Sequence, residues 1–197
     1  MAQCVRLGGG VVHPLIGRYI ARGLSMEPIE AYSLYILGKL SSDKIVILAN
    51  SWLEKGLFTD SLNDIYWEDS PIMADVGPRF EKAIEELNIN KMSRFEAANK
   101  LIELTLTRII NSELEPDVGA TFLYYDVHHV INDEYPDKEF MGDSLGLEHI
   151  FCWLREIWDC RDGSRILYHT DLSRKDAEAK FNEHLIEEAQ KWLATAI

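Results

Sequence analysis

Three residues between positions 126 and 133 have the types and spacing of metal ligands. Asp126, His129 and Asp133 are three and four residues apart, so on an α-helix all three lie on one face. Carboxylate oxygens and imidazole nitrogens together suit several divalent transition metals. The spacing predicts a candidate metal site, and with it a metal-dependent helical enzyme as an alternative hypothesis. The helical HExxH and ExxH motifs do not occur, and a histidine beside a carboxylate is more often a structural pair, so we expect no cofactor.

The second candidate chemistry is recognition of a protein by residues 132–143, NDEYPDKEFMGD. This stretch is rich in turn-forming residues, and we expect an exposed loop. Aromatic anchors within a charged rim are typical of interfaces, and the charge would attract a basic partner. The alternative is a polar loop whose two rings fold back onto the core. The predicted partner-binding residues are Asp133, Glu134, Tyr135, Asp137, Glu139, Phe140 and Asp143.

A similar combination occurs once more, where Trp67 precedes Glu68 and Asp69. Acidic side chains are common throughout the chain, which has a formal net charge of −13 in 197 residues. Such a surface repels phosphate groups, so binding to nucleic acid or to anionic membranes is disfavoured and a basic protein partner is favoured. The alternative explanation of the charge is solubility alone. No apolar run approaches the length of about 20 residues that a membrane span needs.

The three cysteines, Cys4, Cys152 and Cys160, indicate a reducing compartment. Their number is odd, and the last two are more than two turns apart on one predicted helix, too far to form a disulfide. We therefore expect a cytoplasmic protein.

The stretch 147–160, LEHIFCWLREIWDC, predicts an amphipathic helix with a broad apolar stripe. Asp143 or Ser144 could cap its start, and Gly163 suits the turn after it. Because a stripe with several aromatic and aliphatic residues needs several partners to cover it, we expect this helix near the middle of the core.

The rest of the chain is dominated by helical spacing. Pro28 fits a first helical turn, as do Pro78 and Pro116, and Ser93 with Glu96 forms a capping box. The stretches KIVILA, LTLTRII and RILYH leave a minor β element open, although helix is favoured for the first. The predicted fold is all-α, an irregular multi-helix bundle of about seven helices. It is a single domain over residues 1–197, with an irregular N-terminal arm over 1–24.

Within residues 80–131, the sequences EELNIN, SRFEAA and IINSELEPDVGATFLYYDV follow one another. This quarter of the chain resembles small, acidic, uncharacterised bacterial helical proteins. The resemblance implies a bacterial cytosolic protein and leaves open the immunity type, which neutralises a toxin. It brings no functional residues with it.

The leading hypothesis is therefore a non-enzymatic binding protein that blocks a basic protein partner, such as a toxin, through an acidic and aromatic surface. A metal-dependent enzyme is the second hypothesis. A structural subunit, or a homo-oligomer joined by exposed aromatic residues, is the third.

Overall fold

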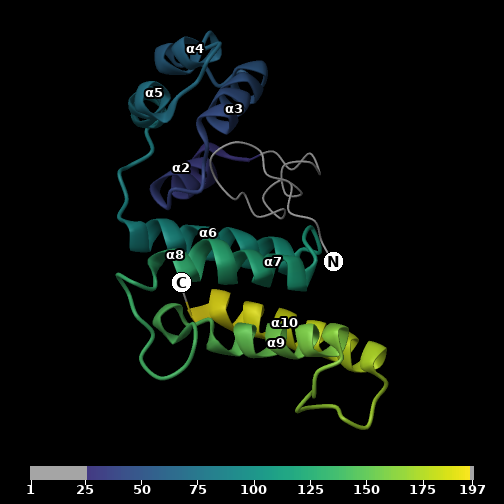
Figure 1. Cartoon of the computed structure of the whole chain (residues 1–197). Helices are drawn as coiled ribbons and strands as arrows, with labels where there is room; N and C mark the ends of the chain where they lie inside the picture. Colours follow the sequence, from purple (N-terminus) through teal and green to yellow (C-terminus); the bar gives the residue numbers. More distant parts are fainter. Residues whose placement is uncertain (1–25, 196–197) are drawn as a thin grey trace.

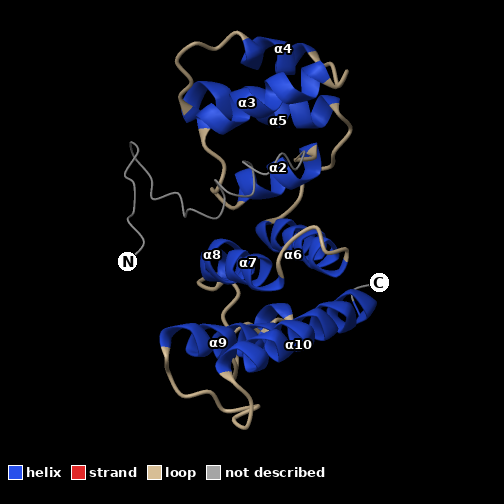
Figure 2. Cartoon of the chain, turned by 90° about the vertical axis from the view of Figure 1, so that its right-hand side faces the viewer, coloured by secondary structure: helices blue, strands red, loops and turns tan. Residues whose placement is uncertain are grey.

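The computed structural model describes residues 26–195, and these residues form helices and connecting loops without a strand (Figures 1 and 2). The predicted all-α, multi-helix fold is confirmed. The expected arm over residues 1–24 lies outside the described residues. The helices are α2 (Pro28–Ile36), α3 (Ser42–Glu54), α4 (Asp60–Tyr66), α5 (Met73–Glu86), α6 (Arg94–Ile110), α7 (Pro116–Phe122), the π-helix η1 (Leu123–His128), α8 (His129–Ile131), the 3₁₀ turn η2 (Asp143–Leu145), α9 (Glu148–Asp162) and α10 (Arg174–Thr195).

The helices are stacked in layers (Figures 1 and 2). At one end α4 packs against both α3 and α5, and at the other end α9 and α10 lie side by side. Between these ends, α6 contacts α2 on one side and α10 on the other, and it also packs against α7 and η1. Helix α6 is thus the element that joins the two ends of the molecule.

The central position of α6 corrects the expectation that the helix now seen as α9 lies in the middle. The apolar stripe of α9 is buried as predicted, but α10 and α7 cover it. Helix α6 is better suited to the centre because small and large apolar side chains lie on more than one of its faces, so that two layers can approach it. Its buried residues are Ala97, Ala98, Leu101, Ile102, Thr105, Leu106 and Ile109.

Local signals place the helix ends. The capping box of α6 is present: the Ser93 hydroxyl accepts from the Glu96 backbone N–H at 3.2 Å, and the Glu96 carboxylate accepts from the Ser93 N–H at 2.7 Å. Gly163 ends α9 with a φ of +88°, a left-handed conformation that glycine adopts without steric cost. Pro78, in contrast, is not in a first turn, because α5 begins earlier, at Met73.

The stretches with strand-like composition do not form strands. KIVILA lies within α3 and LTLTRII within α6, while RILYH forms part of the loop between α9 and α10. Helical periodicity over the longer window decides the first two, since most of their apolar side chains face the buried cluster, although Ile47 is 59% exposed. No helix among residues 26–195 is both long and apolar enough to cross a membrane.

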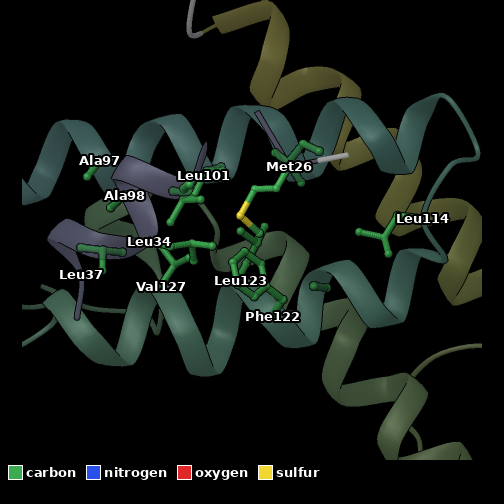
Figure 3. Close-up of a cluster of buried hydrophobic side chains, with 14 of the residues drawn as sticks. Met26, Leu34, Leu37, Ala97, Ala98, Leu101, Leu114, Phe122, Leu123 and Val127 are labelled. Atoms are coloured by element: carbon green, nitrogen blue, oxygen red, sulfur yellow. The ribbon is translucent and has the colours of Figure 1, made fainter. Parts of the chain in front are cut away.

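One continuous hydrophobic core runs through the stack. Figure 3 shows part of it, with Met26 drawn among side chains of α2, α6, α7 and η1. The carbonyl of Met26 also accepts a hydrogen bond from the buried Trp52 indole of α3 at 2.8 Å. The core therefore holds α7 and η1 in place, and these two elements carry the residues considered next.

Candidate binding surface

The helix that begins at Pro116 widens into the π-helix η1 after its second turn. A π-helix has more residues per turn than an α-helix, so residues five apart become neighbours. The ring centroid of Tyr124 accordingly lies 4.4 Å from that of His129, closer than the 6.3 Å to His128. Such wide turns occur frequently at functional sites.

The wide turn also separates the residues of the predicted metal site. Asp126 is buried and pairs with Lys39 at 3.0 Å, whereas His129 and Asp133 are exposed. Residues 26–195 contain no group of three His, Cys, Asp or Glu side chains that could hold a metal ion. The α-helical spacing assumed for Asp126, His129 and Asp133 was wrong, because the segment is partly a π-helix. Within the described residues, Asp126, His129 and Asp133 therefore do not form the metal site that the spacing predicts.

His129, the histidine of the predicted metal site, has a lowered pKa. Partial burial lowers the pKa of His129, and the neighbouring His128 and Lys39 lower it further. The ring packs against Tyr124 and Tyr125. His129 is therefore a neutral, aromatic-like group near pH 7, and it belongs with the rings around it.

The predicted binding loop, residues 132–143, is tied together by its own acids; we call it the acidic loop. The Asp137 carboxylate accepts from the Gly142 N–H at 2.9 Å and the Ser144 hydroxyl at 3.0 Å, and it lies 2.7 Å from His128 Nε2. Burial raises the pKa of Asp137, but the bonds from Gly142, His128 and Ser144 outweigh it, so that this pKa is lowered. Because a carboxylate only accepts, His128 Nε2 carries a proton. The Asp137 carboxylate therefore bonds to groups inside the loop and to the buried His128, and holds the loop in its folded form.

Asp143 has a similar role at the surface. Its carboxylate accepts from the backbone N–H groups of Lys138, Glu139 and Phe140 at 2.9, 2.8 and 3.0 Å. These three bonds lower the pKa of Asp143. It does not cap α9, whose N-cap residue is Leu147 without a side-chain bond. The expected cap from Asp143 or Ser144 is therefore absent, because the loop uses both side chains.

The other predicted binding residues divide into two groups. Glu134 forms an ion pair with Arg94 at 2.7 Å, and the Tyr135 ring packs 4.9 Å from Phe95, so both attach the loop to α6. Asp133, Glu139 and Phe140 are exposed, and Glu134 and Tyr135 also remain exposed despite their contacts. The Tyr135 ring thus lies against Phe95 but is still 36% exposed, and the Phe140 side chain is more open, at 59% exposed.

Beside the exposed end of the acidic loop there is a pocket of about 220 Å³. Helix α9 and the wide turn supply aromatic walls that meet nearly at right angles: Tyr124 makes angles of 85° with Phe151 and 88° with Trp158. The rest of the lining is Met141, Arg155, Asp159 and Asp162. Two carboxylates against one guanidinium leave this lining with a net negative charge.

Several side chains extend this pocket into a larger surface. Tyr125 is 39% exposed, Met141 is 41% exposed, and Phe140, the residue before Met141, is 59% exposed. The Tyr125 ring centroid also lies 6.1 Å from that of Trp158, which links the wide turn to α9. We call this set the aromatic surface; its residues are Tyr124, Tyr125, Phe140, Met141 and Trp158, with Asp159 and Asp162 at the rim.

Sequence reasoning predicted Phe140 as a binding residue but did not predict the pocket. Trp158 lies within the stretch 147–160, for which the sequence predicted only an amphipathic helix, and Tyr124 and Tyr125 were not singled out. The pair of tyrosines followed by two histidines was the available signal. Its meaning depends on the wide turn, which α-helical spacing does not reveal.

The combination at Trp67 forms a second exposed surface at the far end of the molecule. Trp67 is 71% exposed and meets Tyr66 edge to face at 4.8 Å, and Ile72 and Met73 are exposed nearby in sequence. Glu68 is paired with Arg79 at 2.9 Å. The end formed by α3, α4 and α5 therefore offers an independent site for comparison (Figure 1).

Searches with the models of known protein families, among curated proteins and among solved structures found no match to this chain.

Proposed function

We propose that this chain is a non-enzymatic binding protein that engages a basic protein partner through the aromatic surface. The observation that carries the proposal is the pocket, where rings at right angles lie beside carboxylates. The net charge of −13 supports it, because a field of that sign attracts a basic partner over a distance.

The pocket suits the side chain of a lysine or arginine. The aliphatic part of such a side chain can lie along the rings of Tyr124 and Trp158, while its charged end reaches Asp159 or Asp162. Around it, Tyr125, Phe140 and Met141 offer apolar contact area of the kind that anchors interfaces. An immunity-type inhibitor, which neutralises a basic toxin, would use a surface of this chemistry.

The test compares two doubly substituted variants that lose the same charge. Asp159→Asn with Asp162→Asn changes the rim of the aromatic surface, and Asp64→Asn with Asp69→Asn changes exposed acids around Trp67. Proteins from the source organism are captured on each variant and on the parent chain, eluted with rising salt and identified by mass. We expect a stoichiometric basic protein that the first variant binds about tenfold more weakly and the second binds normally.

The outcomes separate the two surfaces. Equal capture by all three chains would contradict a role for Asp159 and Asp162 in binding. Loss of the partner only from the Asp64 and Asp69 variant would move the binding site to the surface around Trp67.

A further inference from the structure

The loop between α9 and α10, residues 163–173, is held by rings; we call it the ring-held loop. Tyr168 packs against Trp153 of α9 at 5.3 Å, and His169 packs against Phe181 of α10 at 5.6 Å. The Leu167 N–H donates to the buried Glu156 carboxylate at 2.9 Å. At His169 the backbone is left-handed, with a φ of +50°. That conformation is unfavourable for a residue with a Cβ, so the contacts of this side chain must hold it.

The decisive contact joins the two histidines His169 and His184. Their Nε2 atoms are 3.1 Å apart, their ring centroids are 5.4 Å apart, and their planes differ by 11°. The centroid distance exceeds the nitrogen distance by about 2.3 Å, roughly one ring radius on each side. Both nitrogens therefore lie between the centroids, close to the line that joins them. The rings are end to end in nearly one plane, which is the geometry of a straight N–H···N hydrogen bond.

The other nitrogen of His184 fixes where the protons lie. His184 Nδ1 is 3.3 Å from the Glu187 carboxylate, which can only accept, so Nδ1 carries a proton. In the neutral ring Nε2 is then the acceptor, and His169 Nε2 must donate to it. A first added proton, on His169 Nδ1, leaves this bond intact. A second would have to sit on His184 Nε2, and two N–H groups would then face each other.

We propose that His169 and His184 form a proton-controlled latch that keeps the ring-held loop closed when the pair carries at most one added proton and releases it when both rings are charged. Release removes the contact that holds the left-handed backbone at His169. It also frees Tyr168 from Trp153 and exposes the apolar side chains beneath the loop. Histidine is the side chain suited to this role, since its charge changes between about pH 8 and pH 5.

Charged groups near the pair come from both helices: the buried Glu156 of α9 accepts from the Leu167 N–H at 2.9 Å, and the others lie on α10. Glu187 contacts His184 directly, and Glu183 acts on it from the preceding residue, although Lys180 neutralises Glu183 at 2.6 Å. Helix α9 presents the Trp153 ring, which stacks on His184 at 4.7 Å and does not titrate. When both rings carry a proton on each nitrogen, the two Nε2 N–H groups face each other across 3.1 Å and neither can accept.

Amide hydrogen exchange at Leu167 tests the latch, since its N–H is protected only while the loop is closed. In the full chain, protection corrected for the intrinsic pH effect should fall at least about fivefold between pH 7.5 and pH 5, as expected for loss of one hydrogen bond. His184→Gln keeps an acceptor opposite His169 but removes the second titrating ring, so protection should stay high at both pH values. His184→Phe keeps a ring on Trp153 without an acceptor, so protection should be low at both.

The glutamine variant also isolates the cause. It retains Glu156, the acceptor of the Leu167 N–H. Equal loss of protection at pH 5 in the parent chain and in His184→Gln would assign the opening to Glu156 and overturn the latch. Protection in the parent chain that does not change with pH would overturn it as well.

Discussion

The two long loops beside α9 are held closed by different chemistry. The acidic loop before α9 is held by carboxylates, with Asp137 and Asp143 accepting six hydrogen bonds from backbone and side chains between them, apart from the contact to His128. The ring-held loop after α9 is held by aromatic and imidazole rings, with one carboxylate, Glu156, bonded to its backbone. Acidic residues in a loop sequence can therefore hold the loop together instead of binding a partner. The loop on the other side of the same helix is held mainly by aromatic and imidazole rings.

The difference has a consequence for binding. In the acidic loop, the charges that suggested an interface are largely used within the protein, and this leaves Phe140 and Met141 exposed beside the pocket. A carboxylate with several internal donors is a poor partner for a ligand, because binding would have to replace those bonds. The loop thus acts mainly as a support that positions two apolar side chains.

The largest expected effect concerns how closely the acidic loop packs on α9. Gly142 has a φ of +89°, and a Cβ there would lie 2.6 Å from the Phe151 ring. Gly142→Ala should lower the free energy of unfolding by about 4 kcal/mol, combining backbone strain with overpacking. Urea unfolding followed by circular dichroism measures this change through the midpoint.

Gly163→Ala is the matched control for that substitution. Gly163 has nearly the same φ, +88°, with nothing within 4 Å of the added Cβ. Gly163→Ala should therefore lower the free energy of unfolding by only about 1–2 kcal/mol. Equal losses in the two variants would mean that the Phe151 contact contributes nothing and that the two loops do not differ in packing.

A smaller effect is expected from removing the carboxylate at the centre of the acidic loop. Asp137→Ala leaves His128, Gly142 and Ser144 without their acceptor, and His128 is buried, with its Nδ1 already unpartnered. We expect a loss of about 2–3 kcal/mol in the free energy of unfolding, measured in the same way. Asp133→Ala, at an exposed residue of the same loop, should change it by less than about 0.5 kcal/mol. Similar losses in both would show that the internal bonds of Asp137 are not what closes the loop.

Much of the fold was predictable because it depends on local signals. Ser93 with Glu96 and Gly163 marked helix ends correctly, since capping and left-handed glycine depend on few residues. Which helix lies at the centre was not predictable, because it depends on how the layers meet. Helix α9 has the more aromatic stripe, yet α6 holds the central place.

The candidate site was less predictable than the fold. The sequence correctly predicted a loop over residues 132–143. The roles of Asp137 and Asp143 could not be predicted, because they depend on hydrogen-bond donors that only the folded loop brings together. The spacing argument at Asp126 failed because one wide turn changed which residues are neighbours. The pairing of His169 with His184 joins a loop to a helix and has no periodic signature.

The smallest expected effect is local and separates the two loops by pH. The pKa values of Asp137 and Asp143 are lowered from the usual 3.8, so the stability they contribute is present above that value and is lost as the pH falls through their lower, folded values. At pH 5 both carboxylates remain charged, and the Phe140 and Gly142 amides that they accept from should stay protected from hydrogen exchange. Protection of the Leu167 amide in the ring-held loop should by then have fallen about fivefold or more. Simultaneous loss at all three amides would instead indicate that the two loops open as one unit, and the distinction between carboxylate and imidazole closure would fail.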